Sequence, residues 1–180
     1  MSFAKNLIHG TNFDHTSLNA LQKVALRGVV MSFLFFGLLA IEGLIMRMVK
    51  LGPTNPLPDM FSHASHFFAI MTAHPIVGIF GSTYQLVFSA FIFLVPFLAK
   101  KPLYSVKLAN ATWLLITIGT ALAWIACFAW HYAPLYTLYW PLPADLKQFE
   151  AIGGIVFIVG AALIMVGTLC FIYNIYATIF

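Results

Sequence analysis

Charged residues are scarce in this chain. Lys and Arg number 9 and Asp and Glu number 5 among 180 residues, so 8% of the chain is charged, against about 25% in a typical soluble domain. Hydrophobic residues make up 62% of the sequence, and the mean hydropathy is +0.94. Because a surface this apolar is stable only in lipid, the composition excludes a soluble globular domain and predicts an integral membrane protein.

Cysteine is also scarce. Cys127 and Cys170 lie within apolar stretches and are not spaced for a metal site, and buried cysteine usually packs as a small apolar residue. We therefore expect neither a disulfide nor a cysteine metal centre. The basic residues sit singly between apolar runs, so nucleic acid is not expected as a partner. Residues 1–24 are polar and lack the apolar core of a cleavable signal peptide.

Four apolar stretches remain, each long enough to cross the bilayer, since a span needs roughly 20 apolar residues. The sequence therefore predicts an all-α domain of four transmembrane helices over residues 25–180, preceded by a polar leader at the membrane surface over residues 1–24. Three prolines within residues 52–58 end the first helix, whereas prolines inside the second are tolerated in lipid. The predicted spans are Ala25–Met48, Ser62–Leu98, Lys107–Trp130 and Phe149 to the C-terminus.

The basic residues also predict the orientation, because Lys and Arg are retained on the cytoplasmic side. With both termini inside, the cytoplasmic face carries six basic residues and the outer face three. We therefore expect an N-in, C-in arrangement, with the aromatic segment 131–141 at the outer interface. The inner set is Lys5, Lys23, Arg27, Lys100, Lys101 and Lys107, and the outer set is Arg47, Lys50 and Lys147.

Polar residues inside the spans are candidate functional residues, because burying them in hydrocarbon is costly. They are Glu42 in the first span and His66, His74 and Gln85 in the second. His74 lies about eight to twelve residues inside its span, roughly 12–18 Å from the outer end. An imidazole at that depth needs a partner, which is either a hydrogen-bonding neighbour or a haem iron.

The remaining candidates allow several roles. His66 precedes His74 by just over two turns and is expected to be solvated or to contact a haem propionate. Glu42 is expected to be neutral, to bond a polar group or to belong to a proton path. Arg47 either extends to the interface or binds a haem substituent. A four-helix dihaem cytochrome is disfavoured, because it needs histidine pairs at two depths and the inner half has none. At most one haem could take both ligands from this chain, with His66 or His74 paired with His131.

Five short motifs resemble subunit I of the haem-copper oxygen reductases, the cytochrome c oxidase family. The run 71–74 (Met-Thr-Ala-His) resembles the family's helix II motif, and the other four follow in the family's order at similar spacing. Together they extend the resemblance over residues of about 25 to 180. The other four are Leu44-Ile45-Met46-Arg47 with Leu51-Gly52-Pro53, Leu94-Val95-Pro96, Trp113-Leu114-Leu115 after Asn110, and Tyr136-Thr137-Leu138-Tyr139-Trp140-Pro141-Leu142.

The resemblance implies that His74 is an axial ligand of a low-spin haem of b or a type and that Arg47 lies near the edge of that haem. In the family the second axial ligand and the copper ligands lie on helices downstream of these four. We therefore expect the N-terminal part of a split subunit I, not catalytic alone, without copper ligands, and sharing its haem with a partner chain. Expected partners are the rest of subunit I, subunit II and other oxidase subunits. The expected location is a prokaryotic plasma membrane rather than a mitochondrial inner membrane.

Some positions depart from the family pattern. Pro75 replaces the small residue after the histidine and is expected to alter the local helix geometry. The basic segment 99–107 lacks the acid that opens a proton channel in many members, and Glu42 has no counterpart in the family pattern. Two other functions therefore stay open: a haem-free accessory subunit of a respiratory complex, and a small ion carrier that uses Glu42.

Overall fold

The computed structural model describes residues 19–51, 64–134 and 150–180, and within them it confirms the all-α fold with four helical spans. The first span is α2 (Ala20–Val49). The second is one continuous helical rod made of α3 (Ala64–Ile76), η4 (Val77–Tyr84) and α4 (Gln85–Ala99). The third and fourth are α5 (Val106–Ala129) and α6 (Ala151–Ile179). All four are long and apolar enough to cross a membrane.

The helix ends lie close to the predicted ones, with one clear difference at the start of α2. This helix begins at Ala20, five residues before the predicted start, inside the segment assigned to the polar leader. Asn19 and Gln22 explain the difference, because they form a reciprocal capping box that satisfies free backbone amides of the first turn. Residues 1–18 and most of the aromatic segment lie outside the described residues.

A π-helix occupies the middle of the second span. It begins at Val77, two residues after Pro75, and runs to Tyr84. Proline has no backbone N–H and its ring crowds the carbonyl four residues earlier, so the regular α-helical pattern cannot continue unchanged past it. The hydroxyl of Thr83 donates to the carbonyl of Gly78, five residues earlier. The predicted change of helix geometry at Pro75 agrees with this observation, and π-helical segments frequently mark functional sites.

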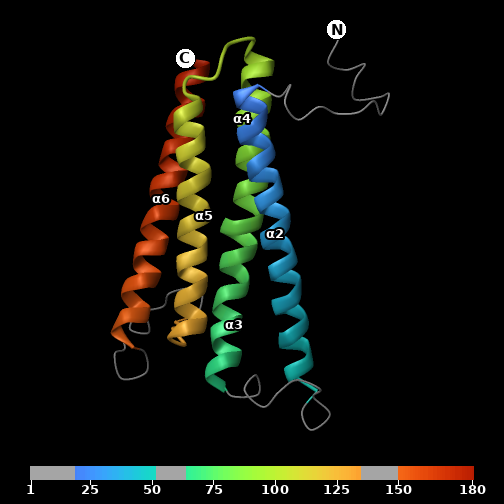
Figure 1. Ribbon diagram of the computed structural model, residues 1–180, viewed down its shortest axis with the longest axis vertical. Helices are drawn as coiled ribbons and strands as arrows, with labels where there is room; N and C mark the ends of the chain where they lie inside the picture. The colour runs from blue at the N-terminus through green and yellow to red at the C-terminus, as the bar shows by residue number, and fades with distance from the viewer. Residues whose placement is uncertain (1–18, 52–63, 135–149) are drawn as a thin grey trace.

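The four spans form an antiparallel bundle in which α2 begins and α6 ends at the same end (Figure 1). α5 packs along α6, and α2 packs along η4 and α4. Small residues allow the close approach of α5 and α6: a Cβ atom on Gly119 would lie 2.6 Å from the carbonyl oxygen of Gly160. Close contact of this kind drives helix association in lipid.

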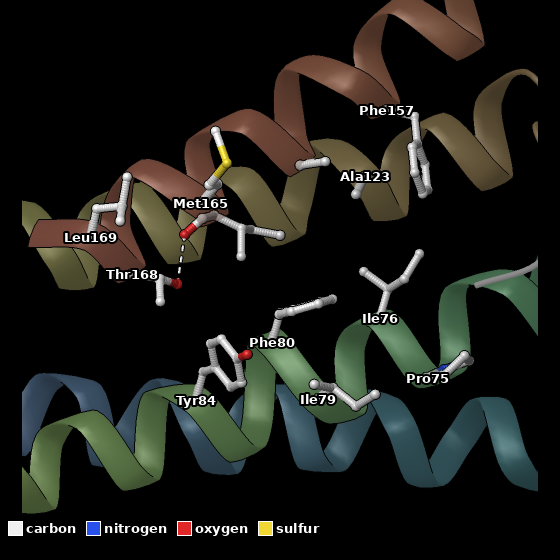
Figure 2. A pocket seen from close by; sticks show the side chains of 12 residues that line it. Pro75, Ile76, Ile79, Phe80, Tyr84, Ala123, Phe157, Met165, Thr168 and Leu169 are labelled. Atoms are coloured by element: carbon white, nitrogen blue, oxygen red, sulfur yellow. Dashed lines mark hydrogen bonds between the residues drawn. The ribbon is translucent and has the colours of Figure 1, made fainter. Parts of the chain in front are cut away.

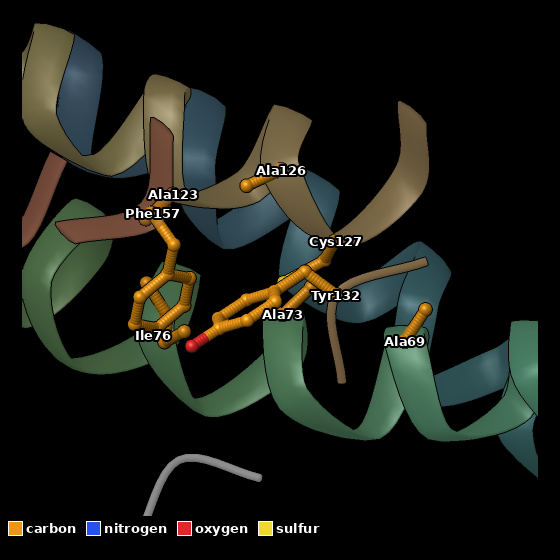
Figure 3. Packing of buried hydrophobic residues seen from close by; sticks show 8 residues of the cluster. All are labelled: Ala69, Ala73, Ile76, Ala123, Ala126, Cys127, Tyr132 and Phe157. Atoms are coloured by element: carbon orange, nitrogen blue, oxygen red, sulfur yellow. The ribbon is translucent and has the colours of Figure 1, made fainter. Parts of the chain in front are cut away.

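The interior contains both apolar and polar side chains. One apolar cluster joins α3, α5 and α6 around Tyr132 and Phe157, whose rings lie 5.1 Å apart between centroids (Figure 3). Burial raises the pKa of the Tyr132 phenol. Large apolar side chains also cover the outside of the bundle, such as Phe33 and Phe97, which are 66% and 72% exposed. These outer side chains suit contact with lipid or with other membrane helices.

Candidate functional site

Glu42, His74 and Trp124 form a polar cluster inside the bundle, contributed by α2, α3 and α5. Glu42 is 2% exposed. The indole nitrogen of Trp124 donates a hydrogen bond of 2.7 Å to Oε1 of Glu42. Oε2 of Glu42 lies 3.8 Å from Nδ1 of His74. Both of these last two atoms are buried and have no hydrogen-bond partner among the described residues, so the cluster is only partly satisfied.

The His74 side chain has one buried edge and one open edge. Its Nδ1 atom is buried, yet 32% of the side chain is exposed. The exposed part therefore lies away from Nδ1, on the remaining edge of the imidazole. Gly43 leaves room beside the ring, since a Cβ atom built there would lie 3.3 Å from Cε1 of His74. Such a ring can offer one nitrogen to a ligand outside the bundle.

Arg47 lies one helical turn beyond Gly43 on α2. Residues four apart share a helix face, so Arg47 is on the side of α2 that contacts His74. The residue is exposed, and it makes no hydrogen bond or ion pair within the described part of the chain. An exposed positive charge therefore lies on the face of α2 that contacts His74.

The other two described histidines meet each other. Nε2 of His66 lies 2.9 Å from Nε2 of His131, and the ring planes are nearly perpendicular at 89°. His131 has a positive φ of 50° just after the end of α5, and this backbone turn brings it back toward α3. The contact of His66 with a haem propionate stays a prediction. His131 meets His66 and not His74, in line with the mismatch in depth between His74 and His131.

Gln85, the remaining polar residue predicted in a span, has a structural role. It is 2% exposed, and its side-chain amide donates to Oγ1 of Thr117 at 2.8 Å. A hydrogen bond between α4 and α5 satisfies a polar group that lipid cannot. The role of Glu42 in a proton path is not tested by these contacts and stays a prediction.

An apolar cleft of about 420 Å³ lies between η4 and α6, on the side of the second span that faces α6 (Figure 2). Pro75, Ile79 and Phe80 line one wall, and Met165 and Leu169 line the other. The hydroxyl of Thr168 points into this region but already donates to the carbonyl of Ile164 at 2.9 Å. The cleft thus suits hydrocarbon and offers little chemistry.

Two contacts of the site could not be predicted from the sequence. Trp124 is 82 residues from Glu42 and lies in an apolar run without distinguishing neighbours. His66 and His131 are 65 residues apart. A tryptophan inside a predicted span is a hint, because its N–H usually finds an acceptor when buried. Within the described ranges, the structure holds no group of three or more His, Cys, Asp or Glu residues that could bind a metal ion.

A comparison with models of protein families places most of the chain in one family. Residues 23–180 match the model of a family described as Cytochrome C and Quinol oxidase polypeptide I, so most of the chain is covered. A search of curated proteins found no match.

Proposed function

Because the chain belongs to the cytochrome c and quinol oxidase polypeptide I family, we propose that it contributes His74 as one axial ligand of a low-spin haem. Members of this family are haem-binding oxidoreductase subunits that work in complexes, and the chain is a multi-pass membrane protein. The observation that carries the proposal is the His74 ring, with Nδ1 buried against Glu42 and the opposite edge open.

The residues around His74 fit a haem. Iron binds the neutral imidazole through one ring nitrogen, and the open edge leaves that nitrogen accessible. Arg47, on the same side of α2, would hold a negatively charged or polar substituent at the haem edge. Ile70 and Val77, on either side of His74 in sequence, are 1% and 0% exposed. They pack the bundle interior and keep water from reaching the buried edge of the ring.

The residues of this chain would bind the haem and orient it. When bound, the haem carries single electrons toward an oxygen-reducing haem–copper centre. His74 would fix the position of the iron, Gly43 would leave space for the ring, and Arg47 would fix the direction of the haem edge. None of these residues reduces oxygen, so the chain acts as one part of a larger oxidase.

We also propose that other polypeptides supply the second axial ligand and the copper ligands. The rest of subunit I and subunit II, in a prokaryotic plasma membrane, are the proposed partners. The exposed apolar side chains of α2 and α6, including Phe33 and Ile155, offer surfaces for packing against such helices. The intact mass of this polypeptide in the purified complex tests the split arrangement. A mass near 20.0 kDa supports it, and a much larger mass contradicts it.

The haem content of the purified complex tests the ligand assignment. We expect His74→Ala to lose one haem per complex in a pyridine haemochrome assay, together with the low-spin optical bands. His131→Asn is the matched control, because it also removes a histidine and asparagine tolerates a positive φ; we expect it to keep the haem. If His74→Ala does not assemble, His74→Met keeps an axial ligand of different strength and should shift the low-spin spectrum.

An unchanged haem content and spectrum in the His74 variants contradicts the proposal. That result, in a complex that still contains the chain, favours a haem-free accessory subunit. A protein purified alone and without haem favours the carrier role for Glu42.

A further inference from the structure

Glu42 directs its two carboxyl oxygens at two different partners. Oε1 accepts the 2.7 Å hydrogen bond from Trp124, while Oε2 faces Nδ1 of His74 at 3.8 Å. The carboxyl group is 2% exposed, and neither Oε2 nor Nδ1 has another hydrogen-bond partner in the described helices. Two unsatisfied polar atoms that face each other in an apolar interior are costly, so their juxtaposition needs an explanation.

Binding of a metal by His74 would explain why these two atoms face each other. When one ring nitrogen of a neutral imidazole binds a metal, the other carries the proton and needs an acceptor. Nδ1 is the buried nitrogen, so it would carry the proton, and Oε2 of Glu42 is the acceptor that faces it. The present separation exceeds the roughly 2.7–3.2 Å of an N–H···O hydrogen bond, so a shift of less than about 1 Å would close it.

We propose that Glu42 is a positioning residue that accepts a hydrogen bond from Nδ1 of His74 and so fixes the tautomer and orientation of the haem ligand. This inference rests on the proposed function, because it requires His74 to bind the iron. Metal-ligating histidines commonly donate their second N–H to a carboxylate, which fixes the ring and makes it a stronger electron donor.

Three helices build this arrangement. The bond from Trp124 on α5 fixes Oε1, which leaves Oε2 as the oxygen that points to α3. Gly43, next to Glu42 on α2, has no side chain to push the imidazole away. Pro75 follows His74 directly, and the helix changes from α to π two residues later. Glu42 therefore meets His74 where the second span departs from regular α-helical geometry.

The expected consequence is a lower midpoint potential of the low-spin haem. A carboxylate that accepts a hydrogen bond from the imidazole increases electron donation to the iron and favours its oxidised form. This role requires Glu42 as a carboxylate, not as the neutral acid expected from its burial alone. Removing the negative charge should therefore raise the midpoint potential. Removing only the indole donor should lower it, because a carboxylate freed from Trp124 becomes a stronger acceptor for His74.

The test uses the whole purified complex, with redox titration of the low-spin haem and EPR spectroscopy of its ferric form. Glu42→Gln keeps the shape of the side chain and removes the charge, and we expect a more positive midpoint potential and shifted g values. Glu150→Gln is the matched control, since Glu150 is exposed and makes no recorded contact with His74. Trp124→Phe is the second variant, with an expected shift in the opposite direction.

The outcomes separate this inference from the proposed function. If His74→Ala removes the haem, but Glu42→Gln and Trp124→Phe both leave potential and g values as in the unmodified complex, the positioning role is wrong and the ligand assignment stands. If Glu42→Gln does not assemble, an unchanged potential in Trp124→Phe overturns the role. If His74→Ala keeps the low-spin haem, the proposed function itself fails, and the positioning role fails with it.

Discussion

Gly119 of α5 and Gly160 of α6 lie in direct backbone contact. A Cβ atom on either residue would lie 2.6 Å from the carbonyl oxygen of the other. The obstructing atom in each case is backbone and cannot rotate away. The crossing of α5 and α6 therefore depends on both positions having no side chain, as is common where helices pack closely in lipid.

Gly160→Ala should destabilise the bundle because the two helices must separate to admit the methyl group. We expect the free energy of unfolding in mixed micelles to fall by about 1–3 kcal/mol, the usual cost of overpacking. Gly37→Ala is the control, since a Cβ atom there meets nothing within 4 Å, and it should be neutral or slightly stabilising. Equal effects of the two substitutions would contradict the account of this crossing.

Trp124→Phe should also destabilise the bundle, since it leaves Oε1 of buried Glu42 without its donor. We expect a loss of about 1–3 kcal/mol in the free energy of unfolding. Trp113→Phe is the matched control, because the buried indole nitrogen of Trp113 has no hydrogen-bond partner among the residues that the structure describes, and its removal should cost little. A double-mutant cycle with Glu42→Leu should give a coupling energy well above zero; additive effects would show that the bond contributes nothing.

Asn174→Leu should loosen the attachment of α6 to the segment before α5. The Asn174 side chain accepts from the backbone N–H of Ser105 at 3.0 Å and donates to its carbonyl at 2.9 Å, with 0% exposure. Losing both bonds at a buried site should cost about 2–4 kcal/mol, counting roughly 1–2 kcal/mol for each. Asn110→Leu removes an exposed bond from Arg27 and a bond within α5 to the carbonyl of Val106. It should cost much less, because that carbonyl keeps its helical hydrogen bond. Similar losses in thermal unfolding of both variants would contradict this difference.

Arg47→Gln should lower the midpoint potential of the low-spin haem, because a positive charge near the haem favours the reduced iron. Coulomb's law at a separation of about 10 Å and an effective dielectric constant of about 20 gives roughly 1–2 kcal/mol. Lys50→Gln, which removes an exposed charge one turn further along, should have a smaller effect. A redox titration in which the Lys50 variant shifts as far as the Arg47 variant would remove Arg47 from the haem edge.

The sequence predicts the number and approximate ends of the spans because these depend on apolar length alone. It does not predict which faces meet, since side chains that face lipid are as apolar as those that face the core. Phe33 and Phe35 illustrate this point: two residues of the same type, two positions apart, are 66% and 8% exposed. Without an amphipathic pattern, the faces of α2 that meet the other helices cannot be assigned from the sequence.

The sequence predicts the candidate residues of the site from their type and their depth in the spans, but it does not predict which of them contact one another. Glu42 and His74 are conspicuous because buried ionisable groups are costly in lipid, and both are found inside the spans. Their juxtaposition and the role of Trp124 depend on how α2, α3 and α5 pack, which local sequence does not encode. Pro75 marked a change of helix geometry, but proline alone does not determine that a π-helix follows.

Binding of iron by His74 is the central claim of the proposed function. A density map of the complete complex, resolved well enough to place side chains, measures the distance between His74 and the iron of the low-spin haem. We predict that Nε2 of His74 lies at bonding distance from the iron while Nδ1 points to Glu42. A map in which the imidazole is well ordered and no iron lies within bonding distance of it would contradict the central claim.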